Sequence, residues 1–167
     1  MKSIYPARSE SAAQPFVAPD GLQRASPGVN SNVMRLESPS YLLELLATEV
    51  VPKELPAAGD VRREIRASTD SFSGASSCWV QADEIASFAS ALSQLFESLQ
   101  GTPLLRSISP GEFMLSLTPI SRRGYVLVRV EFTKRLPHRR AFSTEFEVDL
   151  PSLAPLLSWC RSVNANA

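Results

Sequence analysis

Alternating hydrophobic and polar positions predict β-strands along most of the chain after residue 32. Val61, Ile65 and Ala67 alternate with charged side chains, which is the pattern of a half-buried strand. The same alternation recurs in three later segments: 112–118, 125–132 and 142–150. Further strands are predicted at 33–37, 41–51 and 104–108, and Cys78-Trp79-Val80 is expected to return to the core. The small polar residues 71–77 predict a turn or short loop.

Two segments instead carry apolar residues at helical spacing. Residues 82–99 place seven apolar side chains on one stripe, and residues 152–163 place five. Stripes of this period belong to helices that pack against a core. Because the late strands keep a clean polar face, we expect an antiparallel sheet with one wet side. The predicted fold is therefore α+β, with one antiparallel sheet of about six strands packed against two amphipathic helices.

The first 32 residues differ from the rest. They contain four prolines, many Ser and Ala residues and only scattered large apolar side chains. Such a segment buries too little apolar surface to offset its ordering entropy. We predict a flexible tail at 1–32, which serves as a linker, a partner-binding segment or a dispensable extension, and a single domain at 33–163. Prolines and polar residues stand where a secretory signal would have its apolar stretch.

Composition excludes several classes of protein. The 17 basic residues balance the 17 acidic ones, and the hydrophobic fraction of 44% is enough for a core. A net charge of zero argues against nucleic-acid binding. No apolar run is long enough to predict a membrane helix. Two cysteines do not make the disulfide framework of a small secreted domain.

Residues with catalytic potential are few. His138 lies in a polar, arginine-rich loop without a nucleophile or carboxylate beside it in sequence. Cys160 falls on the stripe of the second helix and Cys78 precedes Trp79, so both thiols are expected to be buried and inert. The chain contains neither a phosphate-binding glycine loop nor a nucleophile elbow. We predict no metal, no cofactor and no enzymatic activity.

Charged residues gather in two places. Seven Lys or Arg residues and one acid occupy positions 122–140, but a strand of about 27 Å separates the two ends of that stretch. The two basic clusters are therefore expected at opposite ends of the sheet, too far apart to form one nucleic-acid groove. Glu145, Glu147 and Asp149 form an acidic row on one strand face. Solvation or pairing with Arg129 explains this row better than acid–base chemistry.

Several segments together resemble the WapI-type immunity proteins and related bacterial domains of unknown function. The shared segments are Cys78-Trp79-Val80, the helix opened by Asp83-Glu84-Ile85, Leu99-Gln100-Gly101-Thr102, Gly111-Glu112-Phe113, Gly124-Tyr125-Val126-Leu127-Val128 and Phe146-Glu147-Val148-Asp149. The resemblance covers about residues 33–163. It implies a small cytoplasmic α+β protein that binds and neutralises a polymorphic toxin, and it supplies no catalytic residue. The toxin class stays open.

The leading hypothesis is thus a non-catalytic interaction protein of the immunity type with a protein partner. The alternatives are a small ligand-binding or enzymatic domain with an unrecognised site, and a structural or phage-related accessory domain. The candidate partner-binding residues lie on the wet sheet face and at its loop ends: Arg122, Arg123, Arg129, Glu131, Arg139, Arg140, Glu145 and Glu147.

Overall fold

The computed structural model describes residues 33–134 and 140–166 of the chain. The first four strands pair in sequential order as an antiparallel sheet, called here the first sheet. They are β1 (Val33–Ser38), β2 (Tyr41–Val50), β3 (Val61–Thr69) and β4 (Ser73–Val80). Short turns join β1 to β2 and β3 to β4, as antiparallel pairing permits, and the longer connection 51–60 joins β2 to β3.

The remaining strands form a second antiparallel sheet, again in sequential order. They are β5 (Leu104–Arg106), β6 (Phe113–Pro119), β7 (Tyr125–Lys134) and β8 (Arg140–Asp149). Val126, Val128 and Val130 are fully buried on the inner face of β7, as their spacing of two predicts. The turn between β6 and β7 ends at Gly124, whose positive φ of 85° suits glycine.

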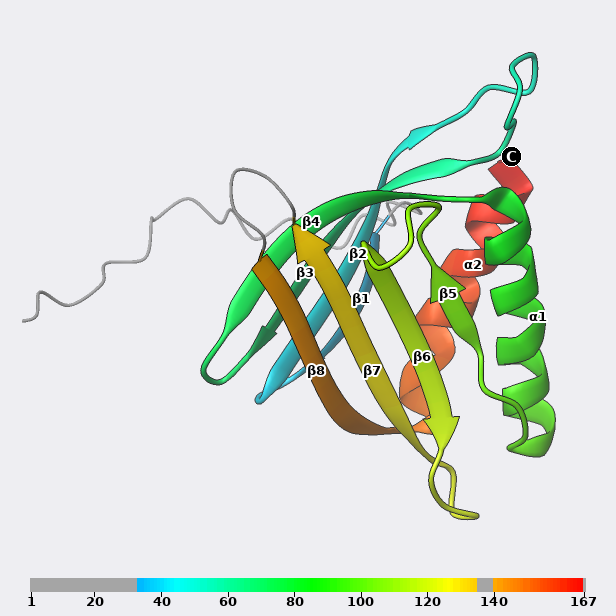
Figure 1. Ribbon diagram of the computed structural model, residues 1–167. Coiled ribbons are helices and arrows are strands. Elements are labelled where there is room, and N and C mark those ends of the chain that lie inside the picture. The colour runs from blue at the N-terminus through cyan, green and yellow to red at the C-terminus, as the bar shows by residue number, and fades with distance from the viewer. Residues whose placement is uncertain (1–32, 135–139, 167) are drawn as a thin grey trace, which may run out of the picture.

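Two α-helices complete the described part, as predicted. α1 (Ala82–Ser98) follows β4 directly and buries its apolar stripe, including Phe88 and Leu92. Leu99, rather than Gly101, takes the left-handed conformation that ends this helix, with a φ of 55°. The two helices lie side by side and close the open side between the sheets (Figure 1).

The second helix begins later than the sequence predicts. A 3₁₀ turn, η1 (Leu150–Leu153), precedes α2 (Ala154–Asn166). Pro151 and Pro155 have no N–H to donate, so regular α-helical bonding starts only beyond this turn. Asp149, the residue before this turn, accepts a hydrogen bond from the Ser152 hydroxyl and makes no side-chain cap hydrogen bond to a backbone N–H.

One continuous core lies between the sheets and the helices. Where the sheets come closest, Gly74 of β4 faces the rings of Phe132 and Phe142, which are stacked with centroids 4.8 Å apart. A Cβ at Gly74 would lie 3.0 Å from the Phe132 ring. Tyr41 on β2 stacks on Phe146 on β8 with ring centroids 3.9 Å apart, and this aromatic pair joins the two sheets.

Two predictions of the fold are wrong. The described strands form two sheets of four, not one sheet of about six. The helix α1 separates the two groups, and each strand pairs with its hairpin neighbour instead of reaching across the helix. The segment 71–77 is not a loop throughout, since β4 begins at Ser73. Its small residues pair with β3 along the whole segment 73–77, and the rings of the second sheet pack on Gly74.

A remote side chain completes the N-terminus of α1. Gln81, the residue at the cap position, makes no side-chain cap hydrogen bond. The buried Asp60, in the connection before β3, accepts a hydrogen bond of 3.0 Å from the Ala82 N–H instead. The carboxylate satisfies a free helix donor and also lies at the positive end of the helix dipole. Asp60 thereby fixes the start of α1 against the first sheet.

Candidate functional site

The outer face of the second sheet carries a small network of ion pairs. Arg129 and Glu145 are cross-strand partners on β7 and β8. The Arg129 guanidinium lies 2.6 Å from a Glu131 carboxylate oxygen and 3.4 Å from a Glu145 oxygen. All three side chains are substantially exposed, so each pair contributes little to stability. The network therefore presents charge to solvent while its cation is already paired.

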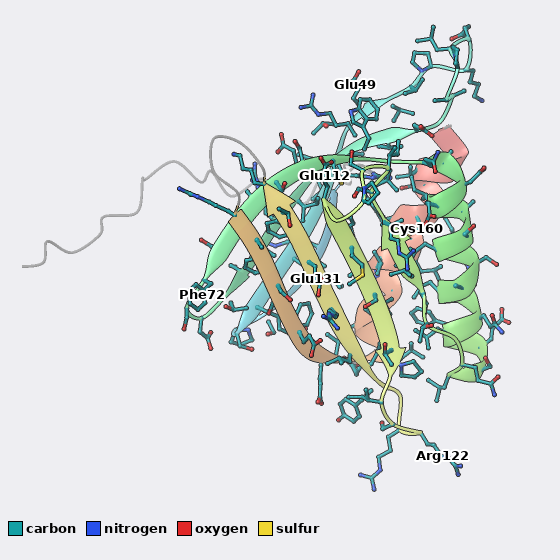
Figure 2. The ribbon with its side chains drawn as sticks, in the orientation of Figure 1. Glu49, Phe72, Glu112, Arg122, Glu131 and Cys160 are labelled. Carbon is teal, nitrogen blue, oxygen red and sulfur yellow. The ribbon has the colours of Figure 1, made fainter. Side chains whose placement is uncertain are left out.

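The other predicted site residues do not join this network. Glu147 follows on the same edge strand, and Arg122 and Arg123 lie in the turn between β6 and β7. Arg140 on β8 lies opposite Lys134 on β7, as its cross-strand neighbour, at the other end of the sheet. Figure 2 shows Arg122 at one extremity of the sheet and Glu131 on its face. Arg139 lies outside the described residues, as does His138.

The basic clusters are accordingly separated by the length of β7. This agrees with the prediction that they do not form one groove. Whether any of these residues touches a partner stays a prediction.

Both thiols are buried and reduced, as the sequence predicts. Burial raises the pKa of Cys78 and of Cys160 to about 12. Because the thiolate is the reactive form of cysteine, these groups are protonated and inert at neutral pH. They contribute packing rather than nucleophilic chemistry.

An arginine that sequence analysis missed lies beside these thiols. Arg63 on β3 is 1% exposed, and its guanidinium carbon lies 4.1 Å from the ring centroid of Trp159 on α2. None of its nitrogens has a hydrogen-bond partner among the described residues. Burial lowers the pKa of Arg63 to about 10, so the side chain is still charged at pH 7. A cation–π contact is thus the one polar interaction shown for this buried charge.

The parity of β3 could have revealed this burial. Val61, Ile65 and Ala67 all face inward, and Arg63 falls at the intervening odd position. In a strand, residues two apart share a face, so the alternation places the guanidinium inside.

Within the described part of the chain, no three His, Cys, Asp or Glu side chains gather as a metal site.

No helix within residues 33–134 and 140–166 is long and apolar enough to cross a membrane.

The sequence analysis also missed two exposed features at the margin between the sheets. Phe72, in the turn before β4, is 74% exposed, and Lys134 ends β7 close to Arg140. An aromatic residue within the polar run 68–77 was the available signal for Phe72. Phe72 lines a cavity only together with residues of β8, which is far away in sequence.

Comparison with known proteins identifies a family. The model of the immunity protein WapI-like family matches residues 54–163, about two thirds of the chain. No curated protein and no solved structure matches this chain. The matched region runs from the connection before β3 through both helices and the whole second sheet, and so covers most of the fold described above. The chain belongs to the immunity protein WapI-like family.

Proposed function

We propose that this protein binds a cognate bacterial toxin and neutralises it by occupying its surface. The observation that carries the proposal is the family match over residues 54–163. A cytoplasmic site of action is part of the same proposal, because it follows from the kind of protein that the family describes.

The chemistry of the described residues supports inhibition by binding rather than by catalysis. The two thiols are buried with raised pKa values, and Arg129, Glu131 and Glu145 on the second sheet are substantially exposed and paired with one another. Side chains of this kind suit recognition, where a charged rim steers association and selects the partner. A stable complex needs about 800 Å² of buried surface on each partner.

Co-expression with a toxin tests the proposal. An immunity gene is expected directly beside a large toxin gene, so the toxin domain encoded there is the natural probe. The full chain should restore growth of cells that express this domain and should co-purify with it, whereas a toxin from an unrelated locus should be neither bound nor neutralised. Absence of both rescue and co-purification with the neighbouring toxin would refute the proposal.

A titration separates binding from catalysis. An inhibitor that acts by occupancy should abolish toxin activity only near one equivalent of protein. Complete inactivation at about a hundredth of an equivalent, well below binding stoichiometry, would show turnover and contradict the non-catalytic mechanism.

A further inference from the structure

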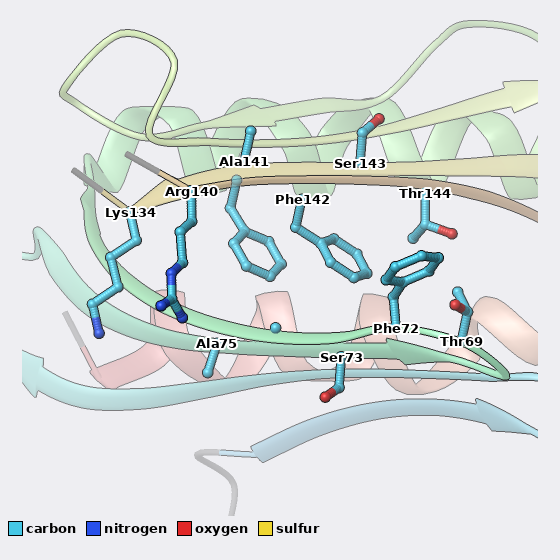
Figure 3. A pocket seen from close by; sticks show the side chains of 12 residues that line it. Thr69, Phe72, Ser73, Ala75, Lys134, Arg140, Ala141, Phe142, Ser143 and Thr144 are labelled. Atoms are coloured by element: carbon cyan, nitrogen blue, oxygen red, sulfur yellow. The ribbon is translucent and has the colours of Figure 1, made fainter. Parts of the chain in front are cut away.

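A groove lies between β4 and β8, at the margins of the two sheets. The helices pack near the other margins, α1 against β5 and α2 against β1. Figure 3 shows β8 along one side of the groove and the start of β4 along the other. Its cavity volume is about 680 Å³, which is within the usual range for binding sites.

Both strands present a free edge to this groove. In the described part of the chain, β4 pairs only with β3 and β8 only with β7. Each strand therefore leaves a row of backbone N–H and C=O groups on its other side. Proteins commonly protect such edges with charged side chains or proline. Residues 73–77 and 141–144 contain neither, so these edges are open to an added strand.

Aromatic side chains line one part of the groove. Phe72 is the most exposed of the large hydrophobic residues in the described ranges. Its ring approaches the cavity from the turn before β4, and the ring of Phe142 approaches it from β8 (Figure 3). Phe142 is held in place by its stacking on Phe132. An apolar side chain of a bound segment would remove the Phe72 ring from water.

The other end of the groove is basic. Lys134 and Arg140 are cross-strand partners, and both are exposed. Neither side chain forms an ion pair within residues 33–134 and 140–166, and no acidic residue lines the cavity. The complementary ligand therefore carries carboxylates at this end.

We propose that the groove binds an extended, acidic segment of the protein partner, which adds to the free edge of β8. The segment places an apolar side chain against Phe72 and Phe142 and carboxylates near Lys134 and Arg140. The identity of the partner rests on the proposed function. The groove itself can be tested without the toxin.

The first test uses the toxin domain encoded beside the gene, with full-length protein. Lys134→Glu with Arg140→Glu, and separately Phe72→Ser, should each weaken the complex about 100-fold. Lys53→Glu with Arg106→Glu, at two exposed positions that do not line the groove, is the matched charge control, and Tyr125→Ser is the matched aromatic control. Both controls should bind like the parent. All these positions are exposed, and unchanged unfolding midpoints would show that folding is intact.

If the parent chain binds the toxin and the groove variants bind equally well, the groove inference is wrong while the proposed function stands. If the parent chain does not bind the toxin, the proposed function fails and a second probe decides on the groove. That probe is a fluorescein-labelled peptide of alternating valine and glutamate, compared with its valine–lysine counterpart.

The acidic peptide should bind at least about tenfold more tightly than the basic one. Lys134→Glu with Arg140→Glu should reverse this preference. Equal binding, or none, would overturn the inference. A self-associating chain whose dimer is broken by Phe72→Ser in sedimentation equilibrium would also overturn it, because a second copy would then be the occupant.

Discussion

The two halves of the described chain follow the same plan but differ in the size of the side chains that fill it. In each half, four antiparallel strands lead into a helical segment. Both halves bury aliphatic strand residues, but the first adds small side chains on β4 and a buried arginine, whereas the second adds the aromatic rings of Phe132 and Phe142. Where the halves meet, the large rings occupy the space left by Gly74. The halves are therefore complementary rather than equivalent.

This complementarity also explains the position of the groove. Gly74 on β4 lets the second sheet approach closely, and the rings of Phe132 on β7 and Phe142 on β8 fill the contact. Gly74, Phe132 and Phe142 also line the groove, together with Phe72. Because the groove is formed by residues of both halves, it exists only while the two halves are packed together. Variants that change the stability of the protein test this packing.

The largest effect is expected from the helix between the halves. Phe88 is 1% exposed in α1, and Phe88→Ala should lower the free energy of unfolding by about 3–5 kcal/mol through loss of buried surface and creation of a cavity. Ser87→Ala, on the exposed side of the same helix, should change it by less than about 0.5 kcal/mol. Chemical denaturation monitored by fluorescence and circular dichroism should show one transition, and two separate transitions would mean that the halves have independent cores.

The buried charge of Arg63 should lower the free energy of unfolding, compared with an uncharged side chain of the same length. Arg63→Met keeps the length of the side chain and removes an unpaired cation, so we expect a gain of about 1–4 kcal/mol in the free energy of unfolding. Arg62→Met, at the exposed neighbouring position, should change it by less than about 0.5 kcal/mol. A clear loss of stability in Arg63→Met would show that the guanidinium makes a net favourable contribution through its contact with Trp159.

A smaller loss is expected at the contact between the sheets. Gly74→Ala places a Cβ 3.0 Å from the Phe132 ring and 3.2 Å from the Phe142 ring, and this overpacking should cost about 1–3 kcal/mol. The cost should shrink in a Phe142→Leu background, because the smaller side chain makes room. Equal costs in the two backgrounds would show that Gly74 does not join the halves through this ring.

The smallest effect concerns the cap of α1. Asp60→Ala should destabilise the protein by about 1 kcal/mol, since the Ala82 N–H loses its acceptor. Asp60→Asn should retain most of the stability because an amide oxygen can still accept the bond. Asp70→Ala is the exposed control and should have no measurable effect in thermal unfolding. Equal melting temperatures for Asp60→Ala and the parent would rule out the remote cap as a source of stability.

Local patterns predicted most of the elements correctly. The alternation in β7 and the stripe of α1 each depend on residues close in sequence, and burial follows directly from their period. The inert thiols were predicted for the same reason, since Cys160 lies on a helical stripe.

Features that depend on distant contacts were not predicted. Nothing local shows that β4 and β5 fail to pair, so the sequence pattern predicts a single sheet. Ser73–Ser77 resembles a loop until the rings of the second sheet pack on Gly74. Phe72 gains significance only beside β8, and Asp60 only beside the start of α1, 22 residues later.

Hydrogen–deuterium exchange of the toxin complex tests the central claim most directly, because it reports which backbone amides the partner covers. The account predicts that binding slows exchange at residues 72–77 and 140–146, the two edges of the groove. Exchange at the turn that carries Arg122 and Arg123 should stay unchanged. Protection confined to that turn or to the outer face around Arg129, with free exchange along both edges, would contradict the account.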